Sequence, residues 1–428
     1  DIGGNGVEGM EAFLNEQLRG VDGYIQSEHA KGGREYRRFR EVQLQPQHGN
    51  RVYLTLVAGL QMVAEEELGA AVTQHQARGG AVVMVQPRTG RILAMANSPS
   101  YDPNRPPVRP EDAHRRRNWG VSYTFEPGST FKIVAATAAL DLGLLSLNDR
   151  VDCGVNGRMS WSFGRVQVKH RDDHAMKERY APFEEVIAES SNIGTFNIAL
   201  KVGKDSYAEY LERFGFNQRT GVRLPMEERG LLMPVSRWTM LDYSRVAVGY
   251  SVAVTPLQLA MAMSALANDG QLMRPQIIDR IEAEDGTVLA APGPEVVRQV
   301  CRPETARLMV RALRRVVQDG TGSLVGMDRY TVAGKTGTAK IAPYREDRYY
   351  ASFVGFFPTE APELCMVVVL EDPNSRLGYY GGRVAGPVFR RIGERAAGYL
   401  GIQPDIPDAT GDSPERAATN LTAVRTHR

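Results

Sequence analysis

A serine and a lysine three positions apart are the residues of this 428-residue chain best suited to covalent chemistry. Glu126-Pro127-Gly128 predicts a turn, after which Ser129 begins an alanine-rich helix that places Lys132 on the same face. The unpaired NH groups and the positive dipole end of a helix N-terminus favour negative charge on that hydroxyl oxygen. The pair therefore predicts a serine nucleophile with a lysine as its nearest base.

A lysine accepts a proton only when its amine is neutral. Burial and a second cation must therefore bring the pKa of Lys132 from about 10.4 to about 7 or 8, which corresponds to roughly 4 kcal/mol. Lys335 is the candidate for this second cation. In the alternative interpretation, Ser129 only caps the helix and Lys132 is solvated in its first turn.

Ser190-Ser191-Asn192 is the second motif, and it precedes a periodic apolar run at residues 193–200 that predicts a helix. The motif is therefore expected at a helix start. The alternative is that Ser190 caps this helix and that Asn192 is one of its first residues, without a further role. Ser146-Leu147-Asn148 fits the same pattern, but turn-forming residues surround it, and there we expect a helix to end.

The third motif, Lys335-Thr336-Gly337-Thr338, lies in a stretch of β-branched and aromatic residues that predicts a strand over 330–338. Gly334 and Gly337 weaken a strand. Close approach of a ligand backbone is one physical reason for them, and a bulged edge strand is the alternative. A peptide could bind beside this strand as an added strand, with Lys335, Thr336 and Thr338 holding its terminal carboxylate.

The order and wide spacing of the three motifs resemble those of the penicillin-binding proteins and serine β-lactamases. Further segments within residues 51–400 resemble class B penicillin-binding proteins, the peptidoglycan transpeptidases that lack a glycosyltransferase domain. These segments are 53–56, 84–95, 99–104, 254–259, 352–356 and 380–385. Glu126-Pro127-Gly128 and Gly249-Tyr250 lean toward the division-type branch, whereas Val57 and Ser251 depart from the family pattern.

The resemblance implies a D,D-transpeptidase that cross-links peptidoglycan through a serine acyl-enzyme and is inhibited by β-lactam antibiotics. It needs no cofactor and no metal. The resemblance gives Ser129 as nucleophile, Lys132 and Ser190 as the groups that move the proton, and Asn192, Lys335, Thr336, Gly337 and Thr338 as the substrate-binding residues. It also implies an oxyanion hole made by the backbone NH groups of Ser129 and Thr338.

The implied fold is α+β, the penicillin-binding protein transpeptidase fold. An antiparallel sheet is covered by helices on both faces, a helical subdomain lies beside it, and Ser129 sits at their junction. The pattern of the chain agrees in part. Residues 81–95 predict a hairpin, residues 364–370 a buried strand, and residues 257–267 and 303–317 helices.

Composition divides the chain into three parts. Residues 1–50 are rich in glycine and arginine and predict the remnant of an N-terminal pedestal or linker, in which Arg34, Arg37, Arg38 and Arg40 form a basic cluster. Residues 51–402 form the predicted transpeptidase domain. Residues 403–428, rich in Pro, Asp, Thr and Arg, predict a disordered tail.

Charge and cysteine content narrow the function classes. A formal charge of +2 does not indicate nucleic-acid binding, and three cysteines are too few for a disulfide framework, although two of them could pair. The mixed-charge loop with His170, Asp172, Asp173 and His174 has side chains that suit a metal, but a solvated loop is the favoured interpretation.

We expect an extracytoplasmic location, on the periplasmic side of a bacterial inner membrane. No apolar run reaches the roughly 18 residues that span a bilayer. The chain begins at Asp1 rather than Met, so we expect a truncated form of a protein whose N-terminal membrane anchor is absent from this sequence. The expected partners are peptidoglycan stem peptides, β-lactams and membrane proteins of the divisome or elongasome.

Two other kinds of function fit the same motifs. A D,D-carboxypeptidase or a serine β-lactamase would use the same fold and let water remove the acyl group, although the sequence shows no clear dedicated hydrolytic base. A β-lactam sensor or a division scaffold would need only a stable adduct or a partner surface.

Overall fold

The computed structural model describes residues 3–27, 29, 31, 33, 41–105 and 109–407. Its centre is a five-stranded antiparallel sheet in the order β16-β17-β18-β4-β5. The strands are β4 (Gly79–Val85), β5 (Ile92–Ser98), β16 (Ala333–Lys340), β17 (Tyr349–Phe357) and β18 (Leu364–Glu371). The predicted hairpin, the predicted buried strand and the strand of the third motif are all present, and the third motif lies on the edge strand β16.

Alternation along the central strands divides the interior into two cores. In β4, Val83 and Val85 contribute to one core, while Val82 and Met84 contribute to the other. Successive side chains of a strand point to opposite faces, and β4 is buried along its whole length. Its apolar residues are therefore continuous rather than alternating with polar ones, as expected for a strand covered on both faces.

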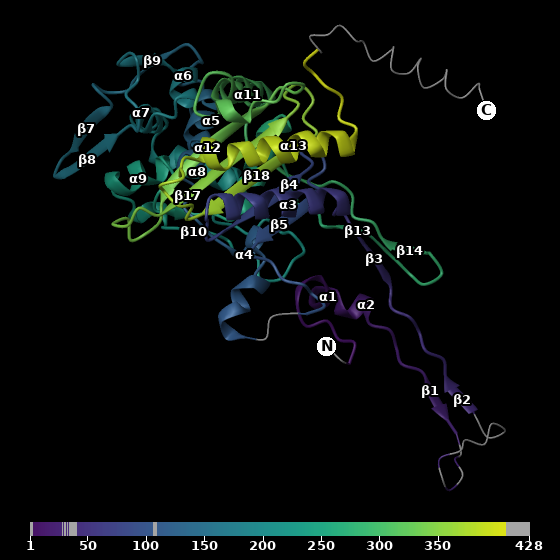
Figure 1. Ribbon diagram of the computed structural model, residues 1–428. Helices are drawn as coiled ribbons and strands as arrows, with labels where there is room; N and C mark the ends of the chain where they lie inside the picture. Colours follow the sequence, from purple (N-terminus) through teal and green to yellow (C-terminus); the bar gives the residue numbers. More distant parts are fainter. Residues whose placement is uncertain are drawn as a thin grey trace.

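Helices cover both faces of this sheet (Figure 1). On one face α3 (Ala58–Gln74) packs on β5 and α13 (Gly386–Leu400), which itself contacts β18. On the other face α10 (Pro256–Ala267) packs on β18, and α11 (Pro303–Gln318) packs on β16. The predicted helices at 257–267 and 303–317 and the α+β class are confirmed.

A helical subdomain lies beside the sheet, around α5 (Ile133–Asp141) and α7 (Asn192–Val202). Its other helices and small strands are α6 (Phe183–Ala188), α8 (Lys204–Arg213), α9 (Met240–Ala247), β6 (Arg150–Asp152), β7 (Arg158–Phe163), β8 (Val166–Arg171) and β9 (Tyr180–Pro182). The helix α5 contacts α7, α8 and α11, so it bridges the subdomain and the helices that cover the sheet.

The remaining elements are short. They are α1 (Gly9–Phe13), α2 (Asn15–Leu18), β1 (Tyr24–Gln26), β2 (Glu41–Leu44), β3 (Arg51–Leu54), α4 (Trp119–Ser122), β10 (Leu231–Leu232), β11 (Val252–Ala253), β12 (Gln271–Met273), β13 (Ile278–Glu282), β14 (Val288–Ala290), β15 (Val296–Gln299) and α12 (Gly381–Val384), with the 3-10 helices η2 (Pro110–Arg116), η3 (Gly128–Lys132), η4 (Val235–Arg237) and η5 (Ser323–Val325).

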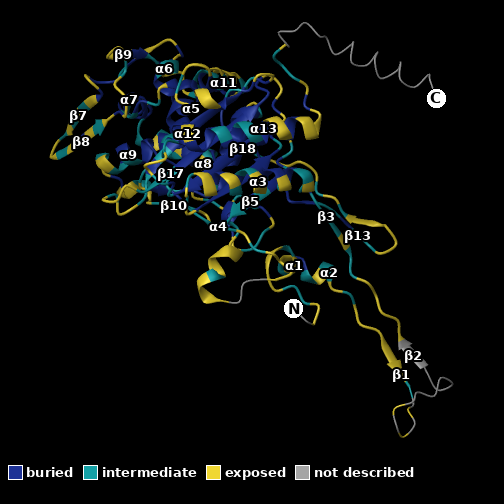
Figure 2. Ribbon diagram, in the orientation of Figure 1, coloured by how far each residue is buried: buried dark blue, intermediate teal, exposed yellow. Residues whose placement is uncertain are grey.

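An arm projects from the body and contains β1, β2 and the sheet β14-β13-β3 (Figure 1). Buried residues gather in the body, whereas the residues of β1 in the arm are exposed (Figure 2). The strand β3 begins at Arg51 and pairs with β13. The assignment of residues 1–50 to a pedestal remains a prediction, and the basic cluster at 34–40 lies outside the described residues.

The predicted C-terminal tail begins too early. Asp405 accepts hydrogen bonds from the backbone N of Thr331, at 2.7 Å, and from its hydroxyl. Residues 403–407 therefore belong to the folded part. Their composition resembles that of a disordered tail, but Asp405 binds Thr331, just before β16. The rest of the predicted tail, residues 408–428, lies outside the described residues.

The pairing of two cysteines that the sequence left open is not present in the part of the chain that the structure describes. Cys153, Cys301 and Cys365 are buried and free. Within the described residues, no helix combines the length and the apolarity needed to cross a bilayer.

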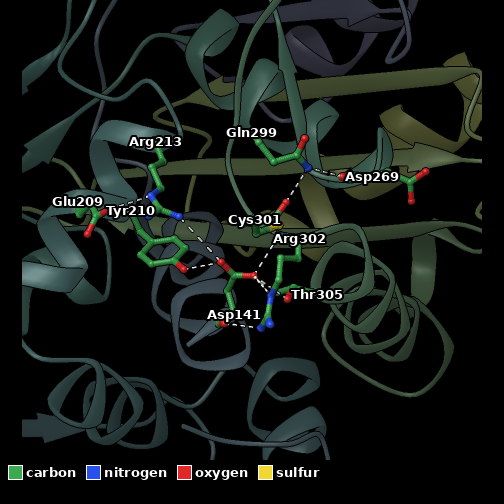
Figure 3. Close-up of polar contacts among 9 residues, drawn as sticks. All are labelled: Asp141, Glu209, Tyr210, Arg213, Asp269, Gln299, Cys301, Arg302 and Thr305. Carbon is green, nitrogen blue, oxygen red and sulfur yellow. Dashed lines mark hydrogen bonds and ion pairs between the residues drawn. The ribbon is translucent and has the colours of Figure 1, made fainter. Parts of the chain in front are cut away.

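Asp141 ends α5 and ties it to two other helices (Figure 3). Its side chain accepts hydrogen bonds from the hydroxyls of Tyr210 in α8, at 2.5 Å, and Thr305 in α11, at 2.8 Å. The backbone N and the Nε of Arg302 donate to it at 3.0 and 3.2 Å. One carboxylate, 8% exposed, thus joins the end of α5 to the first turn of α11.

We predict that Asp141→Asn lowers the free energy of unfolding by about 2 kcal/mol, because hydrogen bonds to a charged acceptor are lost and an amide NH2 then faces hydrogen-bond donors. Thermal and urea denaturation measure the loss. Asp269→Asn is the control, since Asp269 forms an exposed ion pair with Arg307 and should change stability by less than about 0.5 kcal/mol. Equal effects of the two substitutions would contradict the role given to Asp141.

Candidate active site

The 3-10 helix η3 carries Ser129 and Lys132 and continues directly into α5. Gly128 has a φ of 55°, and its backbone N donates to the carbonyl O of Gly249 at 3.0 Å. A Cβ at Gly249 would lie 2.0 Å from the carbonyl O of Gly128, so this contact requires glycine. Gly128 already begins η3, which leaves Ser129 half-buried at a surface hollow while Lys132 is buried.

Lys132 is 1% exposed, and its Nζ donates hydrogen bonds to Ser190, to the carbonyl O at 2.6 Å and to Oγ at 3.3 Å. Burial lowers the pKa of Lys132 to about 8, although the negative charges of Asp172 and Asp173 oppose this change. The interpretation of Lys132 as a solvated first-turn residue is therefore wrong.

Lys335 is fully buried, and its Nζ lies 3.5 Å from the carbonyl O of Thr336. Burial lowers its pKa well below the usual value, and repulsion from Lys132 lowers it further. The sequence predicted that burial and a second cation together lower the pKa of Lys132. Burial is the first cause there, and the repulsion between the two lysines lowers the pKa of Lys335.

The second motif lies between two helices. Ser191, not Ser190, caps α7, because its Oγ accepts a hydrogen bond from the backbone N of Gly194 at 2.9 Å. Ser190 precedes the cap, has a left-handed φ of 61° and faces Lys132. The alternative in which Ser190 is only a helix cap is therefore wrong. Asn192 is the first residue of α7, and its Nδ2 donates to the carbonyl O of Arg171 at 2.9 Å.

The glycines of the third motif are explained by contacts within the protein. A Cβ at Gly337 would lie 2.4 Å from Ser352 Oγ, 2.8 Å from the carbonyl O of Pro127 and 2.8 Å from Thr130 Cγ2. A Cβ at Gly334 would lie 2.4 Å from the ring of Phe353. The reason predicted for these glycines was the approach of a ligand, but packing of β16 against β17 and η3 already requires them.

The two threonines of the motif bind residues of neighbouring segments that also line the cleft. Thr336 Oγ1 lies 2.7 Å from Thr321 Oγ1, and Thr338 Oγ1 accepts a hydrogen bond from the backbone N of Gly381 at 3.0 Å. A Cβ at Gly381 would lie 2.2 Å from the carbonyl O of Gly337. The start of α12 therefore packs directly on the motif and fixes its position.

Two hollows meet at Ser129. The main cleft, about 540 Å³, is lined by Ser129, Ser190, Thr336, Thr338, Thr321 and Tyr380 together with neighbouring residues. The side pocket, about 250 Å³, is lined by Ser129, Asn192, Thr338, Tyr250, Tyr349 and Tyr380, among others. A larger hollow of about 660 Å³ beside α11 contains none of the motif residues, so chemistry rather than size identifies the site.

The chain matches the family described as the penicillin binding protein transpeptidase domain over residues 80–394. This match covers well over half of the sequence. The chain belongs to this family. The matched segment includes all three motifs and lies inside the predicted domain at 51–402, whose exact limits remain a prediction.

Relatives of this penicillin-binding protein support the same assignment. It is 33% identical over 411 residues to the probable peptidoglycan D,D-transpeptidase PenA of Neisseria gonorrhoeae, covering 95% of this chain and 67% of the relative. It is 33% identical over 433 residues to penicillin-binding protein PbpB of Mycobacterium tuberculosis, covering 97% of this chain and 61% of the relative. The predicted class B family, with its lean to the division-type branch, is confirmed.

Solved structures confirm the predicted fold. Penicillin binding protein 3 of Mycobacterium tuberculosis matches with a TM-score of 0.82 and 32% identity, over 95% of this chain and 88% of that one. Structures of that protein complexed with aztreonam and with ampicillin give the same TM-score. The transpeptidase domain of a Burkholderia pseudomallei penicillin-binding protein 3 matches with a TM-score of 0.71 over 83% of this chain.

The sequence missed the residues that support this penicillin-binding site. Asp172 was grouped with His170, Asp173 and His174 as metal-compatible, but its carboxylate binds the start of α7. Within the described part of the chain, no group of three or more His, Cys, Asp or Glu is placed to hold a metal ion. Thr321 carried no sequence signal, because only the fold brings it to Thr336.

We predict that the rate of acylation by penicillin rises about tenfold for each unit by which the pH increases, up to about pH 8. Above that pH the rate stays constant. The pKa of Lys132 is about 8, and only its neutral amine accepts the proton of Ser129. Stopped-flow labelling with a fluorescent penicillin between about pH 6 and about pH 9 measures the profile. Lys132→Met, which removes the titrating amine, should be inactive at every pH, and a flat profile in the unmodified protein would exclude Lys132 as the base.

We predict that Gly337→Ala slows acylation at least about tenfold more than Gly334→Ala does. Both methyl groups meet atoms of the sheet at 2.4 Å, but only the one at residue 337 also meets η3, which carries Ser129. Acylation rates and melting temperatures of the two variants are compared. Equal rates would show that the contact between β16 and η3 does not position Ser129.

Proposed function

We propose that this protein is a peptidoglycan D,D-transpeptidase in which Ser129 is the nucleophile. One observation carries the proposal. Ser129 opens onto a cleft beside the edge strand β16, while the neighbouring Lys132 is buried with a pKa of about 8 and hydrogen-bonds to Ser190. Membership of the family and the printed name of the PenA relative support the same reaction.

In the first half-reaction, Ser129 Oγ attacks the carbonyl carbon between the two terminal D-alanines of a donor stem peptide. The neutral amine of Lys132 accepts the hydroxyl proton. Ser190, 3.3 Å from Lys132 Nζ, passes a proton to the nitrogen of the leaving D-alanine as the C–N bond breaks. The products are an ester on Ser129 and free D-alanine.

In the second half-reaction, a side-chain amine of a neighbouring stem peptide attacks the ester carbonyl. The new amide is the cross-link, and Ser129 recovers its proton. The oxyanion of each tetrahedral intermediate would bind the backbone NH groups of Ser129 and Thr338. The two hollows that meet at Ser129 allow the donor and the acceptor to reach the serine from different sides.

The donor peptide would bind beside β16, which forms the edge of its sheet and can accept an added strand. Thr336 and Thr338 line the cleft and would bind its terminal carboxylate, while Asn192 would bind a backbone amide of the donor. Lys335 lies behind them and supplies positive charge. A bound carboxylate favours the protonated form of Lys335, which opposes the effect of burial on its pKa.

The cellular setting follows from the family. We infer that the protein works at the extracytoplasmic face of a bacterial membrane, with membrane proteins of the division machinery as its partners. β-Lactams would acylate Ser129, in line with the solved complexes of the mycobacterial relative with aztreonam and ampicillin. We also propose that residues 1–50 form the end of a pedestal.

We predict that penicillin adds one covalent adduct to Ser129 and that Ser129→Ala abolishes it without changing the melting temperature by more than a few degrees. The reason is that the hydroxyl is half-buried at the cleft and contributes little to the core. Intact-protein mass spectrometry over time, followed by peptide mapping, measures the adduct. Labelling that persists in the variant would place the nucleophile elsewhere.

The same experiment separates the rival activities. A long-lived adduct agrees with a transpeptidase, whereas free protein and rapidly consumed penicillin would indicate a β-lactamase. A donor stem peptide is then added with and without an acceptor amine. Cross-linked product supports the proposal, and release of D-alanine with hydrolysed donor alone would indicate a carboxypeptidase.

A further inference from the structure

Asp172 is a buried carboxylate that binds the N-terminus of α7. It follows β8, is 5% exposed and accepts hydrogen bonds from Ser191 Oγ at 2.6 Å and from the backbone N of Asn192 at 2.6 Å and of Ile193 at 3.1 Å. These donors belong to the cap and the first two residues of α7. One side chain from a different element therefore holds the whole start of the helix.

The start of α7 determines where Ser190 lies. Ser190 is the single residue between Glu189, which ends α6, and Ser191, which caps α7. The backbone N of Ser191 donates to the carbonyl O of Val186 at 3.1 Å, which fixes the other side of this junction. Ser190 therefore has little freedom, and its left-handed φ of 61° directs its carbonyl O to Lys132 Nζ at 2.6 Å.

We propose that Asp172 is a positioning residue for acyl transfer: by binding the first turn of α7, it holds the carbonyl and hydroxyl of Ser190 against Lys132 and aligns Asn192 with the side pocket. The proposal deepens the proposed function and rests on it. Asp172 reaches the wall of the main cleft, but it is 5% exposed and both of its carboxylate oxygens accept hydrogen bonds from the start of α7. It acts through Ser190 and Lys132.

The charge of Asp172 gives this role a second, measurable effect. Burial lowers the pKa of Lys132, and the negative charge of Asp172 is the first of the two charges that oppose this change. A neutral residue at position 172 therefore lets the pKa of Lys132 fall further below 8. A carboxylate that stabilised a helix start far from Lys132 would not move this pKa.

The other titratable groups around Lys132 and Asp172 would not replace the charge that is lost when Asp172 becomes neutral. Burial lowers the pKa of His170 to about 4 and raises the pKa of Cys153 to about 11, so both are neutral near pH 8. Asp173 also favours the charged form of Lys132, and the Asp172 variants retain this residue. Lys335 faces Lys132, and Glu189 faces Lys335.

The test compares Asp172→Asn, Asp172→Ala and Asp242→Asn. Asp242 is the matched control, since its carboxylate also binds the start of a helix, accepting from Thr239 N at 2.9 Å and Thr239 Oγ1 at 2.6 Å at α9. The rate of acylation by a fluorescent penicillin is measured against pH for each variant, together with the melting temperature. Asp172→Ser, whose hydroxyl can still cap a helix, replaces Asp172→Asn if the latter does not fold.

We expect Asp172→Asn to move the midpoint of the acylation profile down by about one pH unit. We expect Asp172→Ala, which also removes the hydrogen bonds, to lower the plateau rate by roughly 10- to 100-fold. Asp242→Asn should lower the melting temperature and leave the midpoint at its original pH. An unchanged midpoint in Asp172→Asn, or an equal shift in Asp242→Asn, would overturn the proposal.

Failure of this inference can be told from failure of the proposed function. If penicillin labels Ser129 but position 172 does not change the profile, only the role of Asp172 is wrong. If the unmodified protein forms no adduct, the proposed acyl-transfer function is wrong. The role of Asp172 in acyl transfer is then wrong as well.

Discussion

The burial of one ammonium group governs the architecture around Ser129. Taking a lysine out of water is costly unless its charge is compensated or its pKa falls. Lys132 is 1% exposed and donates hydrogen bonds to the carbonyl and hydroxyl of Ser190. The carboxylate of Asp172, which binds the adjacent Ser191, favours the charged form of Lys132 through its negative charge. This partial compensation leaves the pKa near 8, where the same group can hold and release a proton close to neutral pH.

A second constraint is the close contact of three chain segments. The turn at Gly128, the strand at Gly337 and the helix start at Gly381 approach within distances that a Cβ would not allow. Gly128 adjoins Ser129, and Gly337 lies between Thr336 and Thr338. Gly381 donates its backbone NH to the hydroxyl of Thr338. The cleft is therefore built from the sheet edge, the start of η3 and α12 together, and no single element could supply it.

The sequence could indicate Ser129 and Lys132 as candidate site residues because chemistry restricts residue types at short spacings, and the structure places both on η3. It also predicted the central strands from their apolar runs. It did not predict that Asp172 binds the start of α7, because these hydrogen-bond partners begin 19 residues later in the chain. Nor did it predict that Pro127 and Thr130 explain Gly337, because that contact exists only once η3 and β16 have been brought together.

The anchor at Asp141 lies at the opposite end of α5 from Ser129. A helix of this length is a stiff rod of about 13 Å, so a displacement at one end is carried to the other. Arg302 and Thr305, which hold the rod through Asp141, begin the helix α11 that also packs on β16. A small molecule that separated Arg302 from Asp141 would therefore act on both walls of the cleft without competing with substrate, and mutations that exclude β-lactams from the cleft would not protect against it.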